Sequence, residues 1–155
     1  MSTAHFNDIL RRELDGMQRL SAILAEEFST LGRTDPDALD TVLQRKAAIL
    51  DDLQKCATER AKTLAAAGVE ATSTAVEAWL QASSGAQGTQ LWTDLMARTR
   101  EVHDHHQTNV ALLEGLMRNN RQSLDLLTRL ANPDLTYQAD GKTSGSFGTR
   151  SRGQA

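Results

Sequence analysis

The sequence predicts an all-α fold: an elongated antiparallel bundle of three long helices plus one short connecting helix, with a flexible C-terminal tail. Leu, Ala, Gln and charged residues dominate, and aromatic residues make up only 4% of the 155 residues, so the core must be mainly aliphatic. Apolar residues recur every three or four positions over most of the chain. The two prolines, Pro36 and Pro133, bracket most of this helical pattern. We expect one helical domain over residues 1–132 and a tail, rich in Gly, Ser, Thr and Gln, over residues 133–155.

The first helix is predicted over residues 2–31. Positions 10, 14, 17, 21, 24, 28 and 31 form a heptad seam that only Ser21 interrupts. Gly32 follows the last apolar position, where a glycine can take the left-handed conformation that often ends a helix.

The second helix is predicted over residues 36–67. Asp35 can accept hydrogen bonds from the free N–H groups of the new first turn, and Pro36 at the first helical position loses no bond. The apolar seam runs to Leu64 and stops at Gly68. Because the turn between the first two helices is so short, they should form an antiparallel hairpin.

A short helix is predicted over residues 74–82. Thr74 and Glu77 have the spacing of a capping box, and Trp79 and Leu80 contribute to its apolar face. Residues 83–88 (Ser-Ser-Gly-Ala-Gln-Gly) are a loop by composition.

The last helix, predicted over residues 89–131, is the longest. At ~1.5 Å per residue it spans roughly 64 Å, against roughly 45 Å for each of the first two helices, so one end should overhang by about 15–20 Å. An overhang at the Trp92 end would be covered by the short helix with Trp79. An overhang at the C-terminal end, which we expect, would leave an exposed apolar strip that monomeric proteins rarely leave unused. The strip residues are the predicted protein-binding site: Leu124, Leu126, Leu127 and Leu130.

Several polar residues fall on or near the predicted seams. Inward polar residues in a coiled coil usually fix register, although they can also mark a stretch that opens for a partner. The candidates for these two roles are Asn109, Asn119, Asn120 and Ser123. The basic side chains on the seam, Lys46 and Arg60, should lay their methylenes on the core and bring their charge to the surface. The acidic pairs Glu26/Glu27 and Asp51/Asp52 are expected on exposed faces.

No motif in the sequence indicates catalysis, a metal site or a cofactor. His103 and His106 are neighbours on a helix, but no second cluster supplies the further ligands that a metal needs, so we interpret them as a solvated polar face. Cys56 is interpreted as a small packed side chain. A phosphate-binding loop, a nucleophile elbow and a cysteine pair at metal spacing do not occur, so we expect no enzyme.

Charge and hydropathy limit the partners and the compartment. The net charge is −3 and no basic stripe occurs, which argues against a nucleic-acid partner. No apolar run approaches the ~20 residues that cross a bilayer, so no membrane insertion is expected. The first residues do not resemble a secretory signal, and we expect a cytoplasmic protein, either a monomer or a weak homodimer.

The pattern as a whole resembles the FlgN family of flagellar export chaperones, over residues 5 to about 145. In the first helix the similarity lies in Leu10, Glu13 and Leu14 and in the Leu31-Gly32 pair. In the second helix it lies in a run through Asp37, Leu39 and Lys46, in Ile49-Leu50, and in an ending with Arg60, Leu64 and Gly68. Later in the chain it includes Trp79-Leu80, Asn109 and the segment Tyr137-Gln138-Ala139-Asp140-Gly141. Two positions depart from the family pattern, with His106 in place of Asn and Val110 in place of Gly.

The resemblance implies a cytoplasmic chaperone that binds C-terminal helical segments of hook–filament junction proteins (FlgK/FlgL type). It would keep them soluble and deliver them to the flagellar type III export apparatus, and the position that matches the family's export-gate contact is Tyr137. An amphipathic segment lying in an apolar helical groove would account physically for such binding. The alternative is a structural coiled-coil adaptor that forms a homodimer and has no export role.

Overall fold

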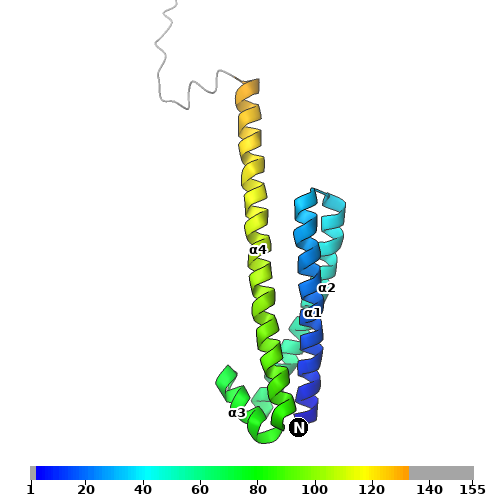
Figure 1. The fold of residues 1–155 in the computed structure, drawn as a ribbon, viewed down its shortest axis with the longest axis vertical. Helices are drawn as coiled ribbons and strands as arrows, with labels where there is room; N and C mark the ends of the chain where they lie inside the picture. Colours follow the sequence, from blue (N-terminus) through cyan, green and yellow to red (C-terminus); the bar gives the residue numbers. More distant parts are fainter. Residues whose placement is uncertain (1–2, 133–155) are drawn as a thin grey trace, which may run out of the picture. The chain divides into compact units, whose positions relative to one another are not determined.

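The computed structural model describes residues 3–132, which form four α-helices: α1 (Thr3–Arg33), α2 (Pro36–Ala66), α3 (Ser73–Ser83) and α4 (Gly85–Ala131) (Figure 1). The all-α class is confirmed, with three long helices and one short one. None of the described helices is long and apolar enough to cross a membrane. The described residues divide into two units, the first ending at Leu113 and the second beginning at Glu114. The predicted tail, residues 133–155, lies outside the described residues.

Helices α1 and α2 form an antiparallel hairpin with a very short turn (Figure 1). Asp35 caps α2 as expected, since its side chain accepts a hydrogen bond from the backbone N–H of Ala38 at 3.1 Å and Pro36 follows at the first helical position. The expected helix end at Gly32 is wrong. Helix α1 continues to Arg33, and Thr34 takes the left-handed conformation instead, with φ at 57°.

Two expectations about the connection between α3 and α4 are also wrong. The residue that caps α3 is Thr72, which accepts from the N–H of Ala75, so the capping-box pair of Thr74 and Glu77 lies inside the helix. Residues 83–88 are not a loop, because α4 already begins at Gly85. Gly85 has a φ of 66°, which only glycine adopts without strain, and this lets the chain reverse within a single turn.

The core of the first unit is built in two apolar clusters. At the end where α3 lies, side chains from all four helices pack together: Phe6, Leu10, Leu64, Val76, Leu80, Trp92 and Leu95. Phe6 meets the ring of Trp79 edge-on at 5.0 Å between centroids. Helix α3 therefore covers the Trp92 end of α4. The second cluster joins α1, α2 and α4 through Leu20, Leu24, Leu53 and Val102.

Helix α4 runs parallel to α1 and antiparallel to α2 within this unit. Asn7 of α1 lies against Gly88 of α4, and further along the same two helices Asn109 bonds to Leu24. One face of α4 is buried from residue 88 to residue 109. Its buried members are Gly88, Trp92, Leu95, Val102 and Asn109.

Candidate protein-binding site

The second unit presents an exposed apolar helix. Its described part is the C-terminal portion of α4 with Asn132, and every residue from Leu116 onward is exposed. The four leucines singled out from the sequence are among the most exposed large apolar side chains of the described chain: Leu124 (55%), Leu126 (58%), Leu127 (61%) and Leu130 (71%). Spacings of three and four residues bring them together on adjoining rows of the helix. Sequence reasoning did not include Leu116 and Met117, which are also exposed and which the same spacing pattern contains.

Two shallow apolar grooves lie in the first unit, one on each side of Asn109. The first has a volume of about 270 Å³, and Leu24, Phe28 and His105 are among the residues that line it. The second, of about 160 Å³, is lined mainly by aliphatic side chains of α1, α2 and α4: Leu31, Leu39, Leu43, Val110 and Leu113. Phe28 and Leu43 each expose more than 40% of their surface. Here the three long helices leave apolar surface uncovered.

A buried ion pair lines the second groove. Lys46 of α2 donates from Nζ to both carboxylate oxygens of Glu27 of α1, at 3.0 and 3.2 Å. Only 14% of the Lys46 side chain and 8% of the Glu27 side chain are exposed. We expected Lys46 to carry its charge to the surface and Glu27 to lie on a solvated face. Both expectations are wrong, because the two side chains pair with each other inside the bundle.

Arg60 makes the equivalent contact nearer the other end of the hairpin. Its Nε donates to Glu13 at 2.9 Å, and its guanidinium lies 5.6 Å from the ring centroid of Trp92. Glu13 is buried and Arg60 is largely covered. The expectation that Arg60 would surface its charge is also wrong. Each of the two buried acids of α1, Glu13 and Glu27, is thus paired with a basic side chain of α2 and lies near a residue of α4: Trp92 for the first pair and Asn109 for the second.

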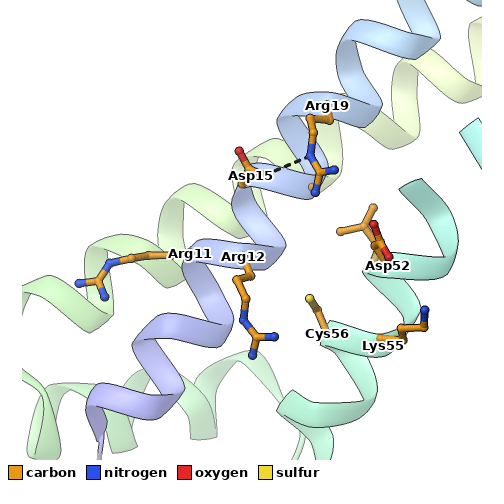
Figure 2. Close-up of a pocket in the computed structure, with 9 residues that line it drawn as sticks. Arg11, Arg12, Asp15, Arg19, Asp52, Lys55 and Cys56 are labelled. Atoms are coloured by element: carbon orange, nitrogen blue, oxygen red, sulfur yellow. Dashed lines mark ion pairs between the residues drawn. The ribbon is translucent and has the colours of Figure 1, made fainter. Parts of the chain in front are cut away.

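A hollow of about 450 Å³ lies between α1 and α2 (Figure 2). Its rim is charged, and most of these charges are paired, for example Arg19 with Asp15, and Arg12 with Glu59 at 2.7 Å. Figure 2 shows Arg12 and Cys56 extending into the space between the two helices, whereas Arg11 points away from it. Burial raises the pKa of the Cys56 thiol, and the charge of Arg12 opposes this more weakly. A thiol with a raised pKa is a poor nucleophile at neutral pH.

The histidines and the polar seam residues, whose roles the sequence did not decide, lie in different parts of the structure. His103, His105 and His106 are exposed on α4, and residues 3–132 contain no group of three or more His, Cys, Asp or Glu that could hold a metal ion. Asn109 is buried in the first unit, whereas Asn119, Asn120 and Ser123 are exposed in the second. Tyr137 lies outside the described residues.

Comparisons with known proteins agree on one family. The sequence profile described as "FlgN protein" matches residues 1–145. The chain is 31% identical over 130 residues to the flagella synthesis protein FlgN of Salmonella typhimurium (strain LT2), an alignment that covers 83% of this chain and 92% of that protein. The identically named protein of Salmonella typhi matches with the same identity and coverage. No solved structure shows significant similarity. With its helical fold and a profile match over nearly its full length, the chain belongs to the FlgN family.

Proposed function

We propose that this chain acts in flagellar biogenesis as a cytoplasmic export chaperone. It binds C-terminal helical segments of hook–filament junction proteins (FlgK/FlgL type), keeps them from associating with one another, and brings them to the flagellar type III export apparatus. Membership of the FlgN family and the names of its relatives, which are flagella synthesis proteins, support the flagellar role. Binding alone performs this task, so the mechanism needs no catalytic residue, metal or cofactor.

The observation that carries the proposal is the row of exposed leucines in the second unit. In water, an apolar stripe at three- and four-residue spacing on a helix is unfavourable unless a second apolar surface covers it. An amphipathic partner helix has the matching stripe and can place one anchor on each turn. The proposed partner-binding residues are Leu124, Leu126, Leu127 and Leu130, and we add Leu116 and Met117 as neighbours with the same exposure.

Size-exclusion chromatography with light scattering, using the C-terminal segment of a hook–filament junction protein, tests the proposal. We expect a complex with one copy of each chain. Replacing Leu124 and Leu127 together by Asp should weaken it by about 2–4 kcal/mol if both are anchors. The helix itself should persist, because both side chains are already exposed.

A matched control separates apolar contact from charge. Arg118→Asp changes the net charge by the same two units, and position 118 is nine residues from Leu127, on the opposite side of the helix. This variant should bind the segment like the unaltered chain. The absence of any complex with the unaltered chain would contradict the proposal. A concentration-independent homodimer that buries the leucines would favour the structural adaptor instead.

Contact with the export gate is proposed for Tyr137, on the strength of the family likeness around it. Tyr137→Ala should leave junction-protein binding intact and reduce secretion of those proteins and swimming motility. Normal secretion by a Tyr137→Ala strain would remove this residue from the proposal.

A further inference from the structure

Asn109 connects all three long helices through one buried polar cluster. Its side-chain Nδ2 donates to the backbone oxygen of Leu24 at 2.9 Å and to Oε2 of Glu27 at 2.7 Å. Glu27 in turn accepts both hydrogen bonds from Lys46 of α2. Only 4% of Asn109 is exposed, and it is the last buried residue of α4. We call Asn109, Glu27 and Lys46 the polar clamp.

The polar clamp lies at a boundary in the packing of the first unit. On the side toward α3, the apolar cluster of Leu20, Leu24, Leu53 and Val102 is closed. On the other side the aliphatic groove of about 160 Å³ remains open, although Leu43, Val110 and Leu113 are well exposed there. The clamp is therefore the last closed layer between α4 and the hairpin.

Hydrophobic association alone would not leave this groove open. Its aliphatic walls would gain free energy by moving together and excluding water. The amide of Asn109 opposes this movement, because both of its acceptors lie on α1 and the bonds persist only at one rotation and spacing of α4. A seam asparagine fixes orientation in this way at some cost in stability.

We propose that Asn109 is a positioning residue that holds this groove open for the helical segment of the partner. The inference rests on the proposed function. The occupant follows from the walls of the groove: Leu39 and Leu43 of α2 lie four residues apart and Val110 and Leu113 of α4 lie three apart, which gives the groove two apolar rows at the spacing that an amphipathic helix matches.

Asn109→Leu tests the inference because the two possible roles of the residue predict opposite changes in stability. Leu has the same number and branching of side-chain heavy atoms as Asn, is apolar and leaves the Glu27–Lys46 pair in place. We expect an unchanged or higher midpoint of thermal unfolding, a narrower groove, and an affinity for the junction-protein segment at least about tenfold lower. Asn109→Gln, which keeps the amide, should retain affinity to within about threefold. Val102→Leu, a size increase in the closed cluster, is the control and should bind normally.

A pair of spin labels measures the distance between α2 and α4 beside the groove directly. Ala47 of α2 and Ala111 of α4 are exposed and small, and replacing Cys56 by Ser leaves only the two introduced cysteines. The unaltered clamp should give one narrow distance distribution. Asn109→Leu should give a shorter distance, and Asn109→Ala, which removes the amide without filling its place, a broader distribution.

The outcomes separate the two proposals. If the unaltered chain does not bind the segment, the proposed function fails. If it binds and Asn109→Leu binds equally well, the positioning role is wrong while the proposed function stands. A fall in affinity that accompanies an equal loss of stability in Asn109→Leu and Asn109→Gln would show a merely structural residue and also overturn the inference.

Discussion

Arg60 donates from Nε to Glu13 at 2.9 Å, and only 4% of the Glu13 side chain is exposed. The guanidinium also lies over the ring of Trp92, which attracts a cation through the electron density of its face. The pair therefore joins α1 and α2 and contacts α4 in one place. An acid buried in this way depends strongly on its partner, because water cannot replace the lost hydrogen bond.

Removing Arg60 should be far more damaging than removing an exposed arginine. Arg60→Met leaves the Glu13 carboxylate buried without its base, and we expect the free energy of unfolding in urea to fall by about 3–5 kcal/mol. Arg60→Lys keeps the charge but loses the planar group over Trp92, so its loss should be smaller. Arg12→Met, which removes the exposed pair with Glu59, is the control and should lose less than about 1 kcal/mol. Equal losses for positions 12 and 60 would refute a buried role for Arg60.

The ion pair of Glu27 and Lys46 predicts a non-additive double substitution. Lys46→Met leaves a buried carboxylate and should reduce the free energy of unfolding by roughly 3 kcal/mol. Adding Glu27→Leu removes that charge, so the double variant should be at least as stable as Lys46→Met alone. Urea denaturation of both single variants and the double variant gives the coupling free energy between the two side chains. Simple addition of the two single losses would mean that the residues do not interact.

The sequence predicted the helices well because their apolar period extends over many turns, and it predicted the start of α2 because Asp35 and Pro36 act locally. The buried face of α1 was harder. The predicted seam contains positions 14, 21 and 28, whereas the structure buries Glu13, Leu20 and Glu27 and exposes nearly half of Phe28. Helix α1 packs against both α2 and α4, which turns its buried face by about one residue. The period of a single helix does not contain this information.

The sequence also did not show which acidic side chains pair with the buried basic residues. Lys46 and Arg60 occupy seam positions, but only the antiparallel pairing of α1 and α2 shows which acids they meet. The expected loop at residues 83–88 failed for a different reason. The chain reverses direction between α3 and α4 at one left-handed glycine, Gly85, so the residues after it can be helical. By contrast, the exposed leucines could be named from sequence because the apolar series continues past the length of the other helices.

Gly88 should tolerate no side chain, in contrast to Gly115 of the same helix. A Cβ at Gly88 would collide with Oγ of Ser84 and lie 2.9 Å from Oδ1 of Asn7. Gly88→Ala should therefore destabilise the chain by about 1–3 kcal/mol, although Ala is normally the better helix former. At Gly115 an added Cβ meets only the end of Arg118 at 3.9 Å, so Gly115→Ala should keep or raise the helical content. Circular dichroism during thermal unfolding compares the two, and a stabilising Gly88→Ala would refute the close approach of α1 and α4.

Cys56 should be a slow nucleophile whose reactivity rises only at alkaline pH. Burial raises the pKa of its thiol above the ordinary value, and the opposing effect of Arg12 is smaller. Alkylation by iodoacetamide near pH 7 should be slower in the folded chain than in urea, and the midpoint of its pH–rate profile should lie above that of the unfolded chain. A midpoint below that of the unfolded chain would mean that Arg12 dominates.

The same shift predicts how the stability of the protein depends on pH. Above the ordinary thiol pKa of about 8.5 the unfolded chain releases its proton while the folded chain still holds it, so the unfolded state binds fewer protons. The free energy of unfolding should therefore fall as pH rises from about 8 to 10, relative to a Cys56→Ser variant that has no thiol to titrate. Urea denaturation of both proteins across this range isolates the effect, since all other titrating groups are common to the two. Parallel curves for the two proteins would show that the environment of Cys56 favours neither form of the thiol.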